Sequence, residues 1–254
     1  MLGRALCILG FTEQGYREAA ASAEIIRKTS DRVSICRVLS NGMCRVAFLI
    51  GDLAAADQAI THMIDAANSS DTLFWQIEGR FLEGKLFVER GEFEKGLTAL
   101  RNAFEEFRQA GWRASYLEFN GALAEALAGT GQFTEALKVV DEAVGRASRG
   151  DRDGQMWYLP ELIRIKGELL VQQDSIDAAE DCFTQAMQLA REQGALLWEL
   201  RIALSAARLR LKLGQPNDAK AILTPVYDRI KQSFATADMQ AARALLDSLP
   251  ERLS

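Results

Sequence analysis

The stretch ELIRIKGELLVQ, residues 161–172, reads as helix throughout, although it carries a glycine near its middle. Glycine in a helix interior costs about 1 kcal/mol relative to alanine, so Gly167 needs a structural reason. A turn residue, Asp174, follows seven positions later, and the same interval recurs along the chain. The small residues that stand seven positions before a turn residue are Gly3, Cys44, Gly84, Ala124, Gly167 and Ala207.

The turn residues themselves recur at intervals of 40 to 43 residues, as Gly10, Gly51, Gly91, Gly131, Asp174 and Gly214. A glycine in this position ends a helix in the left-handed conformation. Because Asp174 replaces glycine, we expect the fifth turn to differ from the others. A small residue within a helix lets a partner helix approach closely. Each repeat is therefore interpreted as two antiparallel helices, with Gly167 as a packing glycine.

Such helix pairs cannot bury their apolar faces alone, so stability must come from stacking. The sequence predicts an all-α fold, a right-handed superhelical solenoid resembling tetratricopeptide repeats (TPR-like), with six helix pairs. The expected repeat units are residues 1–30, 31–70, 71–110, 111–149, 155–193 and 194–233. Thr236 is a suitable N-cap, and the apolar residues after it predict a C-terminal capping helix over residues 236–249.

Two features bear on the limits of the domain. RASRGDRDGQ, residues 146–155, is interpreted as a surface loop within one domain spanning 1–254, with a domain boundary as the alternative. Only nine residues precede Gly10, which leaves Leu2, Leu6 and Ile8 near an end that no capping helix covers. We expect the chain to be a fragment of a longer protein. The alternative is that another subunit covers this end, giving a homodimer through the N-terminal repeat.

Composition excludes several classes of function. The net charge of −5 gives no basic field, so we expect no direct nucleic-acid binding. No apolar run reaches the roughly 18 residues of a membrane-spanning helix, and the chain is expected to be cytoplasmic. Four scattered cysteines and a single histidine, His62, do not form a metal-ligand pattern. We predict no metal, no cofactor and no catalytic residues, and hence not an enzyme.

The C-terminal half carries a more specific resemblance. WYLPELIRIKGELLV (157–171), AAEDCFTQAMQLAREQGALLWELRIALSAARL (178–209) and LTPVYDRIKQSFATADMQAARALLDSL (223–249) resemble the C-terminal repeat region of large bacterial ATP-dependent (STAND-type) transcriptional regulators. In that family the repeats follow an ATPase, which in turn follows a DNA-binding domain or a class III adenylate cyclase domain. The sequence has no GxxxxGK[ST] phosphate loop, so the family's ATPase is absent from this chain.

The resemblance implies a non-catalytic protein-interaction or sensory domain of such a transcriptional regulator. One alternative is the C-terminal regulatory region of a class III adenylate cyclase, and another is a free-standing adaptor or peptide-binding receptor. The partner would be a protein or peptide, including other domains of the same regulator. No membrane partner is expected.

A partner should bind the concave face, which the first helix of each pair lines in TPR-like solenoids. The residue after each small position is charged in all six repeats, and further residues continue the row one and two turns upstream. The candidate partner-binding face consists of Asn41, Arg45, Phe81, Lys85, Glu125, Glu161, Arg164, Glu168, Arg201 and Arg208. One interpretation is that these charges only solvate one face of each helix. The other is a groove of alternating charge, with Phe81 as an apolar anchor.

Overall fold

The computed structural model describes residues 1–69, 72–111, 117–148, 156–230 and 236–249. The first helices of the six pairs are α1 (Leu2–Ile8), the continuous run α3 (Arg32–Val38), η1 (Leu39–Cys44) and α4 (Arg45–Ile50), α6 (Leu73–Glu89), α8 (Leu117–Gly129), α10 (Leu159–Gln172) and α12 (Leu196–Lys212). Their partners are α2 (Thr12–Ile26), α5 (Leu53–Asn68), α7 (Phe93–Gln109), α9 (Phe133–Ser148), α11 (Ile176–Glu192) and α13 (Pro216–Ile230). A short 3₁₀ turn, η2 (Met156–Tyr158), precedes α10, and α14 (Ala237–Ser248) packs on α12 and α13.

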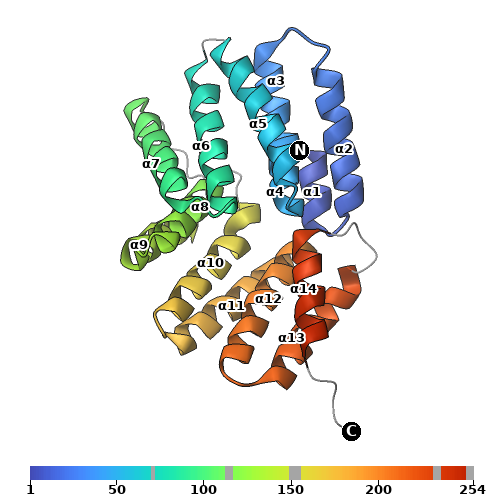
Figure 1. Ribbon diagram of the computed structural model, residues 1–254, viewed down its shortest axis with the longest axis vertical. Coiled ribbons are helices and arrows are strands. Elements are labelled where there is room, and N and C mark those ends of the chain that lie inside the picture. Colours follow the sequence, from blue (N-terminus) through green and yellow to red (C-terminus); the bar gives the residue numbers. More distant parts are fainter. Residues whose placement is uncertain (70–71, 112–116, 149–155, 231–235, 250–254) are drawn as a thin grey trace.

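This arrangement confirms the predicted fold class, a right-handed TPR-like superhelical solenoid of six helix pairs with a C-terminal capping helix (Figure 1). The described residues contain no β-strand. Residues 149–155, which make up most of the segment interpreted as a loop (146–155), lie outside the described residues.

The small residues lie where paired helices come closest, as the sequence predicts. Gly167 on α10 is buried, and a Cβ atom built there would lie 2.5 Å from Cε1 of Phe183 on α11. At Gly84 on α6, a Cβ would lie 2.9 Å from Cγ of Leu100 on α7. Ala124 and Ala207, at the equivalent positions, are fully buried. The glycine in the middle of α10 is therefore a packing glycine, and the helix continues through it.

The turn at Asp174 contradicts the expectation that it would differ. Asp174 has φ of 55°, the left-handed conformation that the turn glycines also adopt. The Ser175 N–H donates to the Leu170 carbonyl at 3.0 Å, as the Glu92 N–H donates to Phe87 at 2.9 Å in the Gly91 turn. Aspartate tolerates this conformation better than most residues. Its carboxylate also accepts a hydrogen bond from Lys212 Nζ at 2.9 Å, which ties the turn to the next repeat.

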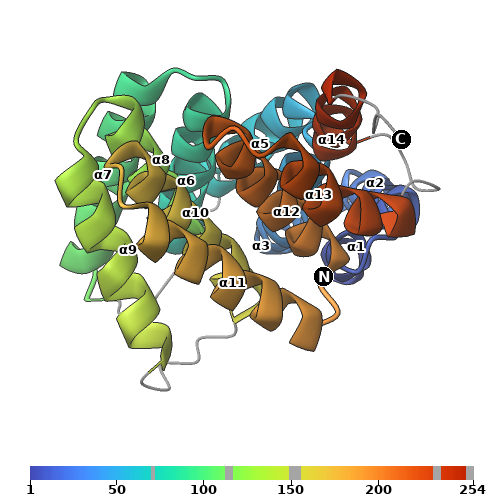
Figure 2. The ribbon, with the colours of Figure 1, turned by 90° about the horizontal axis from the view of Figure 1, so that it is seen from below.

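The superhelix curves until its two ends meet: α1 contacts α12, and Gly51, which ends α4, lies against Ala237 at the start of α14 (Figures 1 and 2). The Arg201 Nη2 donates to the Leu49 carbonyl at 3.4 Å. The Arg4 guanidinium lies 4.5 Å from the centroid of the Trp157 ring. The expectation of an uncovered N-terminal end is therefore wrong in part. Ile8 is buried, although Leu2 remains 61% exposed.

The first helix of the second pair, Arg32–Ile50, contains a π-helical turn at Leu39–Cys44. The Ser40 carbonyl in this turn accepts a hydrogen bond from Arg45 Nη1 at 2.7 Å. Among the described residues, this is the one helix that is long and apolar enough to cross a membrane. Within the protein, 61% of the apolar stretch of this helix is buried, as in a core helix.

Arg45 joins three inner helices through buried ion pairs. Its Nε lies 2.8 Å from Glu118 Oε2 on α8, and its Nη2 lies 2.9 Å from Glu78 Oε1 on α6. All three side chains are at most 5% exposed. Burial lowers the pKa of the Arg45 guanidinium, but the Glu118 and Glu78 carboxylates outweigh this effect and raise it. The planar guanidinium donates along fixed directions to Glu118 and to Glu78. The cluster therefore fixes how the helices that carry these residues are oriented relative to one another.

We expect Gly167→Ala to destabilise the protein by about 1–3 kcal/mol, because the new methyl group must displace the buried Phe183 ring. Chemical denaturation monitored by circular dichroism measures this change. Gly42→Ala is the matched control, since a Cβ at this helical glycine meets no atom within 4 Å. It should be neutral or slightly stabilising. Equal effects of the two substitutions would contradict the packing role of Gly167.

We expect Arg45→Met to destabilise the protein by about 3–5 kcal/mol, because two buried carboxylates lose their counter-charge. Adding Glu78→Gln and Glu118→Gln removes both uncompensated charges, so the triple variant should recover part of the lost stability. Thermal unfolding of the three proteins at one pH tests this. A triple variant less stable than Arg45→Met alone would show that the ion pairs are not the reason for the loss.

Candidate functional site

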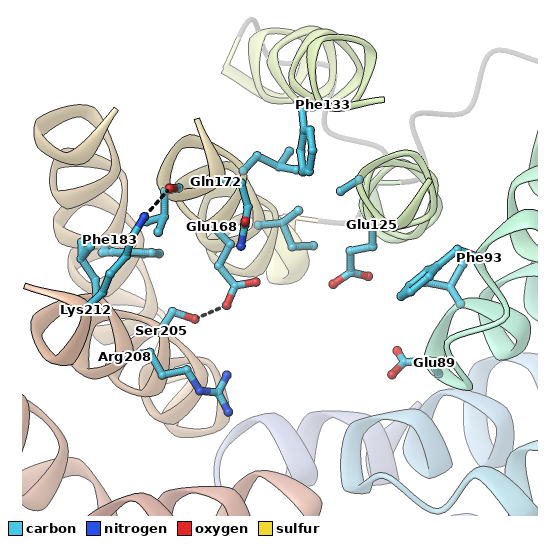
Figure 3. Close-up of a pocket in the computed structure, with 17 residues that line it drawn as sticks. Glu89, Phe93, Glu125, Phe133, Glu168, Gln172, Phe183, Ser205, Arg208 and Lys212 are labelled. Atoms are coloured by element: carbon cyan, nitrogen blue, oxygen red, sulfur yellow. Dashed lines mark hydrogen bonds between the residues drawn. The ribbon is translucent and has the colours of Figure 1, made fainter. Parts of the chain in front are cut away.

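Seven of the ten predicted face residues converge around one polar recess of about 270 Å³ inside the curve of the solenoid. These seven are Lys85, Glu125, Glu161, Arg164, Glu168, Arg201 and Arg208. A larger space of about 750 Å³, here called the inner cavity, adjoins the recess (Figure 3). The two share Glu89, Glu125, Glu168, Ser205 and Arg208 as lining residues. Residues far apart in the sequence thus face a common interior.

Arg164 and Arg201 neutralise the buried carboxylate of Glu161. The Arg164 Nε lies 2.7 Å from Glu161 Oε2, and the Arg201 Nη1 lies 3.1 Å from Glu161 Oε1. Burial raises the pKa of Glu161, but the two guanidinium groups outweigh it and hold the pKa at about 2. Arg201 also reaches Asp238 on α14 at 2.7 Å. The recess is therefore where the capping helix is fastened to the inner helices.

A second set of charges lies on the α6 side of the recess. The Lys85 Nζ lies 2.8 Å from Glu89 Oε1, one helical turn further along α6. Among the residues that the structure describes, Glu125 on α8 has one counter-charge within 4.0 Å, Arg164 Nη2 at 3.8 Å. Burial raises the pKa of the Glu125 carboxyl to about 7, against the opposing effect of Lys85. At neutral pH, Glu125 is therefore poised between its charged and uncharged forms.

Arg208 differs from the other cations of the site. It is exposed, and its guanidinium has no carboxylate within 4.0 Å among the residues that the structure describes. Its side chain reaches into the inner cavity from α12 (Figure 3). The nearby Glu168 is already engaged, by Arg164 Nη1 at 2.6 Å and by the Ser205 hydroxyl, also at 2.6 Å. Arg208 is thus a cation available to an incoming anion.

The walls of the inner cavity are largely apolar away from these charges. Three aromatic rings line it, Phe93 of α7, Phe133 of α9 and Phe183 of α11 (Figure 3). Aliphatic side chains of the inner helices complete the wall: Val88, Ala128, Ile165, Leu169, Val171 and Leu209. An apolar wall beside a few charged groups is the usual composition of a ligand pocket, and 750 Å³ falls in the usual range of volumes.

The remaining three predicted residues lie outside the recess, and the prediction that Phe81 is an apolar anchor for a partner is wrong. Phe81 is fully buried and stacks on Phe119 at a centroid distance of 4.3 Å, so it is a core residue and presents no anchor to a partner. Arg45 is taken up by its buried ion pairs. Asn41 is half-buried, and its side-chain amide donates to the Arg37 carbonyl of its own helix at 3.1 Å.

The burial of the charged row also corrects the interpretation that these residues only solvate helix faces. Arg45, Lys85, Glu161 and Arg164 are each less than 9% exposed. Buried charges persist only when they are paired, and each of these has a counter-charge within 3 Å. These residues instead lie in the interior of the curved solenoid, which the first helices of the pairs line.

Several site residues escape the repeat pattern. Glu89 lies four residues after Lys85, a helical spacing that favours an ion pair, so the sequence carried this signal. Asp238 is on the capping helix, and its arrival at Arg201 depends on the curvature of the whole chain. The rings of Phe93 and Phe133 begin second helices at equivalent places in consecutive repeats, which is a signal for a shared role.

The chemistry offered by this arrangement is that of binding. Arg208 can donate hydrogen bonds to an anion, Glu125 in its ionised form can bind a cation, and the aromatic rings can cover apolar groups. Among the described residues, no group of three or more histidine, cysteine or acidic side chains is placed to hold a metal ion. All four cysteines are buried, and burial raises the pKa of the Cys7 and Cys44 thiols to about 12.

Comparison with known proteins shows the fold. No protein-family model and no curated protein sequence matches the chain. Three crystal structures are similar over most of the chain. BtubC (BKLC) from P. vanneervenii matches with a TM-score of 0.58 and 16% identity, over 96% of both chains. A Rap protein complexed with competence and sporulation factor matches with a TM-score of 0.63 and 13% identity, over 93% of this chain and 68% of that one.

The third is the apo form of RapI, with a TM-score of 0.54 and 8% identity, over 92% of this chain and 87% of that one. All three identities are far below 25%, so the likeness concerns the fold alone. The Rap proteins are TPR-like helical repeat proteins, and this chain has the same kind of fold.

Proposed function

We propose that the chain is a non-catalytic interaction and sensory domain that binds a protein or peptide segment in its inner cavity. The observation that carries the proposal is the cavity itself, whose lining combines three phenylalanine rings with Arg208, a cation that has no carboxylate within 4.0 Å among the described residues. Such a site suits a ligand that carries an anionic group for Arg208 and an apolar group for the phenylalanine rings. The Rap protein complexed with competence and sporulation factor supports the proposal, because a solenoid of similar fold is seen there holding another molecule.

The cavity is placed to report ligand binding to the rest of the solenoid. Its lining comes from four consecutive repeats, α6–α7, α8–α9, α10–α11 and α12. A ligand that contacts all four favours one curvature over others, and so shifts the balance between conformations. Curvature also sets how α12 and α14 meet α4, where Arg201 bridges Asp238 and the Leu49 carbonyl. Binding is thereby coupled to the closure of the ring.

The finer proposal concerns what the domain is attached to. The resemblance of residues 157–249 to the repeat region of bacterial ATP-dependent transcriptional regulators makes such a regulator our preferred setting. A class III adenylate cyclase regulator and a free-standing adaptor are the alternatives. The reading frame upstream of the Met1 codon distinguishes a regulator of either kind from the adaptor. An open frame encoding a GxxxxGK[ST] loop supports a regulator, whereas a stop codon and ribosome-binding site close to Met1 support the adaptor.

A peptide library displayed on phage and selected on the purified chain tests the binding function. Enriched peptides should bind the unmodified protein and lose at least about ten-fold in affinity on Ala128→Trp, which places an indole ring in the inner cavity. Lys138→Glu, at an exposed position of α9 outside the cavity, is the control and should leave affinity unchanged. Circular dichroism establishes that both variants fold. Peptides that bind Ala128→Trp as well as the unmodified protein would exclude the inner cavity as the binding surface.

A further inference from the structure

Pairing of charges within the inner cavity and the polar recess is incomplete at two residues of opposite sign. Lys85 with Glu89, and Arg164 with Glu161 and Glu168, form ion pairs of 2.6–2.8 Å. Among the described residues, Arg208 has no counter-charge within 4.0 Å, and Glu125 has only Arg164 at 3.8 Å. One cation and one carboxyl therefore remain for a ligand.

Arg208 and Glu125 are held apart by the fold. Arg208 is on α12 and Glu125 is on α8, with α10 between these helices in the stack. Both residues line the inner cavity and the polar recess, and their side chains reach into the interior from different walls (Figure 3). Two opposite charges that face one space without touching are complementary to a molecule that carries both charges, separated by its own body.

The body of that molecule must be apolar. Apart from the charged and polar residues, the wall of the inner cavity consists of Phe93, Phe133 and Phe183 with aliphatic side chains of α6, α8, α10 and α12. The volume of about 750 Å³ exceeds what a single amino acid fills and is of the size that binds drug-sized ligands. A short peptide with free termini has all the required features: an ammonium group, a carboxylate and apolar side chains.

We propose that the inner cavity binds a short zwitterionic peptide of apolar residues, with its carboxylate on Arg208 and its ammonium group on Glu125. This assignment rests on the proposed binding function and specifies the ligand class for the same site. The guanidinium of Arg208 offers paired N–H donors that match a carboxylate. The Glu125 carboxylate gains a cation in place of the distant Arg164. No covalent step is involved.

The titration of Glu125 adds a pH dependence to the assignment. Glu125 is surrounded by Lys85 and Glu89 of α6, by Glu161, Arg164 and Glu168 of α10, by Tyr158 before α10 and by Arg208 of α12. Burial raises the pKa of the Glu125 carboxyl to about 7, so an ammonium group finds it ionised above that pH. The ligand's own amine loses its proton near pH 8. Affinity should therefore rise as pH increases through about 7 and fall again above about 8.

Isothermal titration calorimetry of the full chain with the tripeptide Leu-Phe-Leu, its N-acetylated form and its C-terminal amide tests the proposal. We expect the free tripeptide to bind at least about ten-fold more tightly than either blocked form. Arg208→Gln should abolish the discrimination against the amide but keep that against the acetylated peptide. Glu125→Gln should do the reverse and flatten the rise in affinity near pH 7. Lys138→Gln, on α9 outside the cavity, should change neither preference.

The outcomes separate the proposed ligand class from the proposed binding function of the inner cavity. Equal binding of all three peptides, or preferences that survive both substitutions, would overturn the assignment of the two termini. If that binding is still lost in Ala128→Trp, the inner cavity remains the binding surface and only the ligand class is wrong. Absence of binding by the three tripeptides also overturns the ligand class, while the phage selection decides the binding function independently. Circular dichroism of each variant excludes loss of fold as the cause.

Discussion

The close approach of paired helices at one small residue per repeat is the constraint on which the rest of the structure depends. At Gly167, the Phe183 ring occupies the space that a side chain would need, and at Gly84 the Leu100 side chain does the same. This proximity fixes the distance and angle within each pair. Stacking of six such pairs then determines the curvature, because each repeat is rotated slightly from the one before it.

Because the superhelix curves, the row of charged residues on its first helices faces the interior of the protein. In an open solenoid these side chains would face water, but here the N-terminal helices reach the C-terminal ones, and Arg4 lies against Trp157. Burying charges is costly unless each has a counter-charge and hydrogen bonds. Arg45 and Glu161 satisfy that condition with partners on other helices, so these residues fix how repeats sit relative to each other. Among the described residues, Arg208 has no counter-charge within 4.0 Å and Glu125 has only Arg164 at 3.8 Å, so a binding function can be argued from these two residues.

Local features were predictable from the sequence, whereas the closure of the ring was not. The interval from small residue to turn predicted the helix pairs, because helix ends and close contacts depend on residues near one another in the chain. It misjudged Asp174, since aspartate adopts the left-handed conformation there with Lys212 binding its carboxylate. It placed Phe81 on an open face, although Phe104 of its own helix pair and Phe119 of the next repeat cover it, because the register of one helix does not show which side chains of neighbouring helices pack on it. Seven of the ten face residues were nevertheless found around one recess, since repeat register alone sets which side of each helix points inward.

Closure of the superhelix on itself is the central claim, and a distance between its two ends tests it most directly. Leu9, after α1, and Glu192, at the end of α11, are both exposed, and Leu9 packs toward Gly194 with 3.8 Å between its Cδ2 and a Cβ built there. Cysteines introduced at these two positions can be spin-labelled selectively, because the four native cysteines are buried. Double electron–electron resonance should give one narrow distribution at the short end of the measurable range. A broad distribution at long distances would show an open solenoid and contradict the closed interior.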